Sequence, residues 1–332
     1  MIKKEDLRIV FMGTPEFAVA TLKALIEQKY NVVAVVTQPD KPVGRHQDTL
    51  QAPPVKVFAQ EHGIPVLQPV KMKDENFVEE LRSLNADLQV VVAFRMLPEV
   101  VWSMPRFGTF NVHAALLPQY RGAAPINWAV INGETRTGVT TFFLDHDIDT
   151  GRIIEHRIFP IPDDADVEYV YDGLMALGAE IATSTIDKIL EGDGSVKSIP
   201  QEECMEFVGA KTEADLHHAP KIFKETCEIN WQQGAKKVHD FIRGLSPYPG
   251  TWTSLSAPGE KDLVMKIFKT RKTEIPVGEQ VPGTISEDNF RLFVASTDFL
   301  LEILELQITG KKRMSSRDFL NGFKKISHYS CK

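Results

Sequence analysis

The sequence has few cysteines and no long apolar run. Its 332 residues include only Cys204, Cys227 and Cys331, which lie far apart and form no CxxC pair. This pattern argues against a disulfide scaffold and against a zinc site built from cysteines. No stretch approaches the ~20 apolar residues of a transmembrane helix, and the apolar run near the N-terminus is too short for a signal peptide. We therefore expect a soluble, cytoplasmic protein.

Basic residues are in the minority. The chain has 38 Lys and Arg against 45 Asp and Glu, a formal net charge of −7, which excludes a uniformly basic nucleic-acid coat but not a local basic patch. Residues 1–220 hold 20 basic and 32 acidic side chains, a net of −12, whereas residues 221–332 hold 18 and 13, a net of +5. The basic C-terminal part indicates either a polyanionic partner there or only a solvated surface.

The glycine-rich fingerprint of dinucleotide-binding proteins is missing. After the first predicted strand the sequence reads Met12-Gly-Thr-Pro-Glu-Phe17, with a single glycine at the turn. No acidic residue closes the second predicted strand, where a ribose would be bound. The pattern favours a tight turn with Pro15 at the start of a helix and argues against a nucleotide-dependent dehydrogenase.

Short apolar runs alternate with helical patterns in the first half. Near-continuous apolar runs predict strands over residues 7–12, 31–37 and 88–93. Apolar residues at helical spacing predict helices over residues 15–28, 54–62 and 77–84. This alternation predicts an α/β fold with a Rossmann-like, mostly parallel sheet covered on both faces. The ligand crevice of such a sheet lies beyond the carboxyl ends of its strands.

The periodicity weakens between residues 191 and 220, where we place a linker. We thus expect an N-terminal catalytic domain over residues 1–190 and a C-terminal domain over residues 221–332. After a predicted helix over residues 233–244, the C-terminal part contains short strand candidates at 263–268, 283–286, 291–295 and 300–308. Short strands with this spacing predict a small, OB-like β-barrel.

Three polar residues form the candidate chemistry. Asn111 and His113 are two positions apart at the end of a predicted strand, so their side chains face one side. Asp149 belongs to an acidic turn after the next β-like run. The three offer an oxyanion donor, an acid/base and a carboxylate that can orient or charge the imidazole. Spacing alone favours a structural interpretation, in which His113 is a partly buried histidine, Asn111 a turn cap and Asp149 part of an Asx turn.

The acidic turn also contains His146, between Asp145 and Asp147, which raises the possibility of a metal site. No HExxH or His-x₃-His pattern accompanies it, so we expect no metal. Asp147 is the alternative carboxylate if Asp149 points away from His113.

Residues 110–154, FNVHAALLPQYRGAAPINWAVINGETRTGVTTFFLDHDIDTGRII, resemble the signature of folate-dependent formyltransferases. The opening IVFMGTPEFAVATLKAL, the loop VVTQPDKPVGR and the C-terminal stretches INWQQGAKKVHDFIRGLSPYPGTWT and LLEILELQITGKKRMSSRDFLNG resemble the methionyl-tRNA formyltransferases among them. The similarity covers nearly the whole chain, whereas other members share only the catalytic domain.

The resemblance implies transfer of the formyl group of 10-formyltetrahydrofolate to the amino group of methionyl-initiator-tRNA, leaving tetrahydrofolate. It implies Asn111, His113 and Asp149 as catalytic residues. The implied folate-contacting segment is Ala115, Leu116, Leu117 and Pro118, which departs from the family because a serine usually stands first. Residues 90–97 correspond to the wall of the pterin pocket, and their loop is shorter than the usual pattern.

For tRNA binding, the expected residues are Lys311, Lys312 and Arg313 in the basic C-terminal part, with Arg45 in the first-domain loop. A solvated turn is the alternative for the first three. We expect a monomer. Three other functions stay open: formyl transfer to a nucleotide-linked amino sugar, hydrolysis of 10-formyltetrahydrofolate, and tRNA binding without catalysis.

Overall fold

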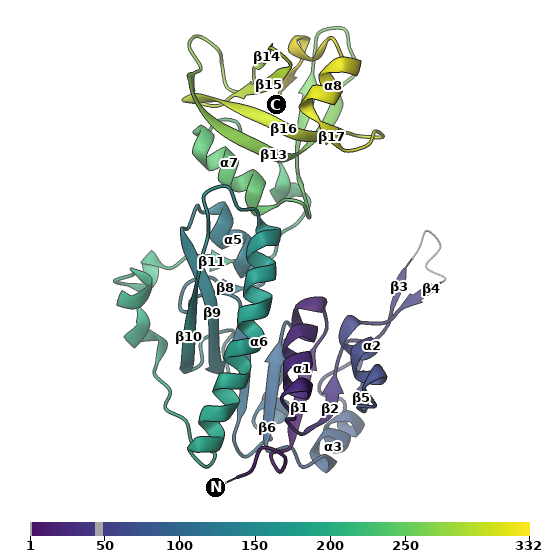
Figure 1. The fold of residues 1–332 in the computed structure, drawn as a ribbon, viewed down its shortest axis with the longest axis vertical. Helices are drawn as coiled ribbons and strands as arrows, with labels where there is room; N and C mark the ends of the chain where they lie inside the picture. The colour runs from purple at the N-terminus through teal and green to yellow at the C-terminus, as the bar shows by residue number, and fades with distance from the viewer. Residues whose placement is uncertain (1, 44–48) are drawn as a thin grey trace. The chain divides into compact units, whose positions relative to one another are not determined.

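The computed structural model describes residues 2–43 and 49–332 and divides the chain into two compact units (Figure 1). Unit 1 comprises Met1–Gly122, Arg136–Pro160 and Tyr171–His218. Unit 2 comprises Ala123–Thr135, Ile161–Val170 and Ala219–Lys332. Each unit is thus assembled from separate stretches of chain, and the contiguous domain boundaries given above stay a prediction.

Unit 1 is built on a seven-stranded sheet in the order β10-β9-β7-β6-β1-β2-β5. Its strands are β1 (Ile9–Gly13), β2 (Val32–Val36), β5 (Val66–Leu67), β6 (Leu88–Val92), β7 (Thr109–His113), β9 (Arg136–Phe143) and β10 (Ile153–Pro160). The first five pair in parallel, β9 pairs antiparallel with β7, and β10 pairs antiparallel with β9. The predicted α/β class with a mostly parallel sheet is confirmed.

Helices cover both faces of this sheet. They are α1 (Glu16–Glu27), α2 (Pro54–Glu61), α3 (Glu75–Ser83), α4 (Glu99–Trp102) and α6 (Val167–Glu191), the last beginning in unit 2. On one face Met12 and Val91 share a buried cluster with Phe77 of α3. On the other face, α6 packs against Val112 of β7. A Cβ added at Gly178 of α6 would lie 3.5 Å from the valine side chain, at van der Waals distance. The central strands are therefore apolar on both sides.

Shorter elements complete the described part of unit 1. Between β2 and α2 lie the strands β3 (Lys41–Val43) and β4 (Thr49–Gln51), which pair antiparallel. Further along the chain are β8 (Arg121–Gly122), β11 (His218–Ala219) and the 3₁₀ turn η1 (Gln201–Cys204).

Unit 2 contains a second sheet of seven strands, all antiparallel. The strands are β12 (Thr251–Ser256), β13 (Leu263–Pro276), β14 (Ile285–Asp288), β15 (Arg291–Ala295), β16 (Phe299–Ile308), β17 (Met314–Ser315) and β18 (Ser330–Cys331). A bridge between Thr284 and Ser330 joins the two outer ends of the sheet, so the sheet curls on itself. The predicted OB-like class is confirmed.

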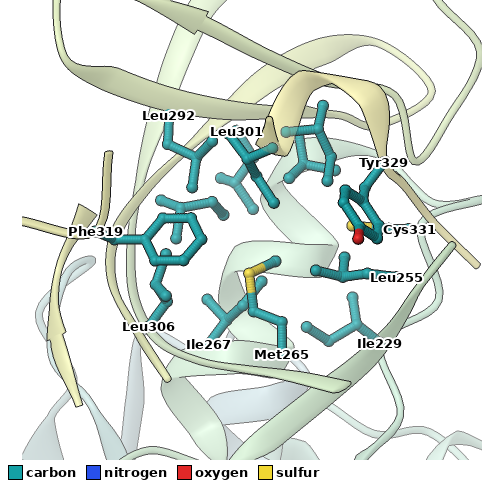
Figure 2. Packing of buried hydrophobic residues seen from close by; sticks show 14 of the residues in the cluster. Ile229, Leu255, Met265, Ile267, Leu292, Leu301, Leu306, Phe319, Tyr329 and Cys331 are labelled. Atoms are coloured by element: carbon teal, nitrogen blue, oxygen red, sulfur yellow. The ribbon is translucent and has the colours of Figure 1, made fainter. Parts of the chain in front are cut away.

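The curled sheet surrounds a large apolar core, to which helices also contribute. The helices of unit 2 are α5 (Pro125–Ile131), α7 (Ala235–Gly244) and α8 (Ser316–Gly322). Figure 2 shows Met265, Ile267 and Leu301 from the strands and Phe319 from α8 pointing toward one another. Each such fully buried side chain stabilises the fold by about 1.5–3 kcal/mol.

An ion-pair network on β16 makes unit 2 sensitive to acid. The Glu302 side chain is only 6% exposed, and its carboxylate accepts hydrogen bonds from Arg291 Nε and Nη2 at 2.9 and 2.8 Å. Arg271 adds a weaker contact at 3.4 Å. The Arg291 hydrogen bonds hold the pKa of Glu302 below its usual range. Because a depressed pKa stabilises the folded state only while the group is ionised, this contribution is lost as pH falls through the folded pKa.

We expect Glu302→Gln to lower the free energy of unfolding by about 1–2 kcal/mol at pH 7. The difference from the wild type should shrink as pH drops below the unfolded glutamate pKa of about 4.3, because the wild-type carboxylate then protonates too. Thermal unfolding between pH 7 and pH 3 measures it. Glu274→Gln, an exchange at an exposed position of β13, serves as the control. A difference that stays constant over this pH range would contradict the prediction.

Candidate active site

Strand β7 brings two polar side chains to the carboxyl edge of the parallel sheet. Asn111 lies in register with Val91 of β6, so it faces the side of the sheet on which α3 packs. His113, two residues later, is the last residue of the strand and faces the same side. The two side chains therefore stand where ligands bind in open α/β sheets.

The two nitrogens of His113 have different neighbours. Its imidazole is 6% exposed, and Nε2 lies 2.9 Å from the carbonyl oxygen of Tyr120. Because a carbonyl only accepts hydrogen bonds, Nε2 carries the proton and donates. The other nitrogen, Nδ1, lies 3.8 Å from Oδ2 of Asp149. The Tyr120 carbonyl thus selects the tautomer that leaves Nδ1 available for proton transfer.

Asp149 is held in place by its own turn between β9 and β10. Its side chain is 13% exposed, its backbone is left-handed with φ of 57°, and its Oδ2 accepts a hydrogen bond from the Gly122 amide at 3.0 Å. Asp145 closes the turn by accepting from the Thr150 hydroxyl at 2.9 Å. Asp147 is exposed. The carboxylate beside His113 is therefore that of Asp149, and the alternative residue points to solvent.

Asn111 has a buried amide oxygen without a partner. Its Oδ1 makes no hydrogen bond to any described residue. A buried polar atom left unpaired costs about 1–3 kcal/mol, so such an atom is normally satisfied by a ligand or water. As it stands, the amide can accept from a bound N–H group, and a half-turn of the amide would present Nδ2 as a donor instead.

The chemistry open to this site follows from the three groups. At 3.8 Å, His113 and Asp149 attract each other without a direct hydrogen bond, and a small polar group or water can bridge them. The arrangement can stabilise an oxyanion and move a proton, which is what acyl transfer requires.

Comparison with known proteins identifies the family. The formyl transferase family matches residues 7–186, and the formyl transferase C-terminal domain matches residues 221–324. The chain is 59% identical over 331 residues to the methionyl-tRNA formyltransferase of Parabacteroides distasonis, covering 99% of both chains. It is 57% identical over 324 residues to that of Bacteroides fragilis, covering 97% of both. The chain belongs to the methionyl-tRNA formyltransferase family.

Solved structures share the fold of this formyltransferase at low identity. An N-formyltransferase from Helicobacter canadensis, in complex with folinic acid and dTDP-3-aminofucose, has a TM-score of 0.64 and 18% identity, over 92% of this chain and 99% of that one. HypX from Aquifex aeolicus, in complex with tetrahydrofolic acid, has a TM-score of 0.60 and 19% identity, over 96% of this chain and 47% of that one. These similarities concern the fold alone.

The expected folate-contacting segment of the formyltransferase, Ala115 to Pro118, is buried and held by internal hydrogen bonds. The Thr140 hydroxyl donates to the Ala115 carbonyl at 2.7 Å and accepts from the Leu117 amide at 3.1 Å. The ring of His156 donates from Nε2 to the Leu117 carbonyl at 2.8 Å. Burial lowers the pKa of His156, in keeping with a neutral ring. Several backbone groups of the segment are thus already engaged within the protein, and folate contact stays a prediction.

The shortened loop after β6 is anchored by Arg95. Its Nη1 donates to the Val70 carbonyl at 2.9 Å and its Nη2 donates to the Pro69 carbonyl, which ties this loop to the one after β5. Its Nε is buried without a hydrogen-bond partner among the described residues. Burial lowers the pKa of Arg95. The arginine therefore fixes the loop that the resemblance assigns to the pterin pocket.

The basic residues expected to bind tRNA differ in their exposure and in the partners that they already have. Lys311 and Lys312 lie exposed in the turn between β16 and β17. Arg313 is exposed too, but its Nε donates to Glu305 at 2.8 Å and its guanidinium lies 4.3 Å from the centroid of the Phe268 ring. Arg45 lies outside the described residues. The two lysines are therefore the residues of this turn best able to meet phosphates.

The described part of the formyltransferase contains neither a metal-binding cluster nor a membrane-spanning helix. Within residues 2–43 and 49–332, no three or more His, Cys, Asp or Glu side chains are grouped so as to hold a metal ion. The helices in the same ranges include none with the length and apolar character needed to cross a membrane.

One residue near the site was missed by sequence analysis. Gln201, in the segment expected to be a linker, is 2% exposed and donates from Nε2 to the Asp149 carbonyl at 2.8 Å. Its partners on that side are backbone carbonyls, which leave no residue-type pattern in the sequence. A glutamine between Pro200 and Glu202 matches no pattern that indicates a site residue.

Proposed function

We propose that the protein transfers the formyl group of 10-formyltetrahydrofolate to the amino group of methionyl-initiator-tRNA, for the initiation of protein synthesis. The observation that carries this proposal is the similarity to methionyl-tRNA formyltransferases over both domains, at 59% identity across 99% of the chain. The pairing of His113 with Asp149 at the carboxyl edge of the sheet supports the same reaction. The substrate pair is a formyl donor and a free amine.

In this proposal Asn111 and the protonated Nδ1 of His113 donate hydrogen bonds to the oxyanion that forms when the amine attacks the formyl carbon. A donor of this kind is worth on the order of 3 kcal/mol. Asp149, whose Oδ2 lies 3.8 Å from Nδ1, orients the imidazole. The attacking nitrogen loses a proton and the departing folate nitrogen gains one, and His113 or a water held by Asp149 carries it. 10-Formyltetrahydrofolate supplies the formyl carbon and the leaving nitrogen.

The residues present fit a folate donor and need no metal for this chemistry. The unpartnered Oδ1 of Asn111 offers a hydrogen-bonding position that a bound substrate would satisfy. We propose that Ala115, Leu116, Leu117 and Pro118 line the donor site, with the loop fixed by Arg95 beside it.

We propose that the protein binds the tRNA through Lys311 and Lys312 of unit 2, with Arg313 and Arg45 as further contacts. The net charge of +5 over residues 221–332 supports this assignment, because phosphate neutralisation dominates nucleic-acid binding. We also propose that the protein acts as a monomer in the cytoplasm, where charged tRNA is used, and light scattering tests the oligomeric state.

A formyl-acceptor assay tests the proposed function. The protein is incubated with 10-formyltetrahydrofolate and methionyl-initiator-tRNA, an amino-sugar nucleotide, or buffer, and the product that receives the formyl group is identified. We expect formyl-methionyl-tRNA. Formyl transfer to the sugar nucleotide, release of formate in buffer alone, or tRNA binding without transfer would each replace the proposal with one of the other functions.

Binding of charged tRNA should weaken steeply with salt, because it releases condensed counterions. We expect Lys312→Ala to weaken binding at low salt and to lower the slope of log K against log salt by about 0.7–0.9 if one phosphate contact is lost. Fluorescence anisotropy with labelled tRNA at several salt concentrations measures both quantities. Lys261→Ala removes the same charge from another exposed turn of unit 2 and should leave the slope unchanged. Equal slopes for the wild type and Lys312→Ala would exclude Lys312 from the interface.

A further inference from the structure

Gln201 makes four hydrogen bonds inside unit 1, to the turn that contains Asp149 and to Arg121. Its Nε2 donates to the carbonyl oxygens of Asp149 and Gly151 at 2.8 and 2.9 Å. Its Oε1 accepts from Nε and Nη2 of Arg121 at 3.0 and 2.7 Å. The side chain is 2% exposed, so these bonds replace water on both ends of the amide. One residue thereby joins two loops that are distant in sequence.

The two loops joined by Gln201 provide the partners of His113. In the first loop the Tyr120 carbonyl accepts from His113 Nε2 at 2.9 Å, and the Gly122 amide donates to Asp149 Oδ2 at 3.0 Å. The second loop holds Asp149 itself, 3.8 Å from His113 Nδ1. A shift of either loop therefore changes a contact of the imidazole.

Both loops adopt backbone conformations that need outside support. Tyr120 and Asp149 have φ of 59° and 57°, in the left-handed region that non-glycine residues rarely occupy. Such residues persist when their surroundings over-determine them. A side chain that accepts from Arg121 and donates to the carbonyl of Asp149 supplies support to both loops.

Gln201 is not required to attach its own segment to the sheet. Two residues before it, Ile199 pairs with Ile153 of β10 by reciprocal backbone hydrogen bonds of 2.8 and 2.9 Å. The segment is therefore already fixed at that point, and the four bonds of Gln201 act on the two loops instead.

We propose that Gln201 is a positioning residue of the formyl-transfer site, which sets the distance between Asp149 and His113 by clamping the Asp149 turn to the Arg121 loop. The activity measurement for this proposal rests on the proposed function, whereas the positioning of the two loops can be tested without it. Catalytic groups must be held to within a fraction of an ångström, and a displacement of about 1 Å can lower turnover by about 100-fold.

The test replaces Gln201 with methionine, which has a similar length and cannot hydrogen-bond to the loops. We expect kcat for methionyl-tRNA formylation to fall by about 10- to 100-fold, while KM for each substrate changes by less than about threefold. The ¹⁵N imidazole signals of His113, in histidine-labelled protein, should shift as the loops move. A residue that only stabilised the fold would lower Tm and leave kcat of the folded protein and these signals unchanged.

Two further variants sharpen the test. Gln201→Glu keeps the acceptor toward Arg121 but sets carboxylate oxygens against the carbonyls of Asp149 and Gly151, so kcat should fall as in Gln201→Met. Glu213→Gln is the matched control, because Glu213 contacts Nη1 of Arg121, at 3.2 Å, rather than the Nε and Nη2 that Gln201 binds, and its side chain is 64% exposed. It should keep the wild-type kcat and the His113 signals.

The proposal is overturned if Gln201→Met or Gln201→Glu keeps kcat within about threefold of the wild type. Loss of the folded state in both variants would also overturn it, since Gln201 would then be a residue of the fold. If the wild type itself transfers no formyl group to methionyl-tRNA, the proposed function fails. The ¹⁵N signals of His113 would still report whether Gln201 positions the loops.

Discussion

Replacing His113 with glutamine is expected to lower kcat for formyl transfer by about 10³- to 10⁴-fold. General acid–base catalysis contributes about 10²- to 10⁴-fold and an oxyanion donor about 10²- to 10³-fold, and the exchange removes the titratable ring that serves both roles. Because the two roles share one residue, their effects do not add fully. Glutamine can keep the hydrogen bond from its Nε2 to the Tyr120 carbonyl, so the loop around Tyr120 should stay in place.

The measurement is single-turnover formylation of methionyl-initiator-tRNA at saturating donor. His146→Gln is the matched control, because His146 lies in the same acidic turn as Asp149, with its side chain 72% exposed and its ring against Trp102. We expect the control to retain wild-type activity and both variants to retain the wild-type Tm. Turnover within tenfold of the wild type in His113→Gln would remove His113 from proton transfer.

Replacing Gly151 with alanine is expected to destroy activity by displacing the Asp149 turn. A Cβ at this position would lie 1.6 Å from the carbonyl oxygen of Phe143, which belongs to β9. The two backbone segments cannot move apart without a large cost in free energy, because the Phe143 amide also donates a hydrogen bond to the Arg152 carbonyl in the same turn. We expect the free energy of unfolding to fall by about 3 kcal/mol or more, because backbone strain of this size belongs to the severe class of substitutions.

Gly322→Ala provides the control for this exchange, because an added Cβ there meets nothing within 4 Å. It should leave both stability and turnover unchanged. Urea unfolding and the formylation assay, performed on the same preparations, separate the two effects in Gly151→Ala. Wild-type stability together with wild-type kcat would show that the turn relaxes without moving Asp149.

The parallel core was predictable because strands buried on both faces must be apolar throughout. Strands β1, β2 and β6 were therefore predicted from their nearly continuous apolar runs. Strand β10 was not predicted, since it is an outer strand of the sheet and carries Glu155, His156 and Arg157 on partly exposed positions. Its pairing with β9, rather than its own composition, makes it a strand.

In unit 2, strand β12 and the second half of strand β13 were not predicted from the sequence, for a similar reason. Strand β12 buries two threonines and only one aliphatic side chain, Leu255. The Thr251 hydroxyl donates to the Ile267 carbonyl at 2.7 Å and the Thr253 hydroxyl to the Lys332 carbonyl at 3.2 Å. Strand β13 continues to Pro276, well beyond its predicted end at residue 268, because it pairs with β16 through a charged stretch. Hydrogen bonds to partner strands define these elements, and hydropathy does not report them.

The amino-acid sequence by itself determined the fold class, the family and the residue types of the candidate site, because buried strands and reactive groups each demand particular side chains in a particular order. Only the tertiary structure decided that Asp149 rather than Asp147 stands beside His113, and that the Tyr120 carbonyl selects the histidine tautomer. It also revealed Gln201 behind both loops. Distances between remote loops and hydrogen bonds to backbone carbonyls depend on how the chain packs, and neither is encoded by the identity of the residues that supply them.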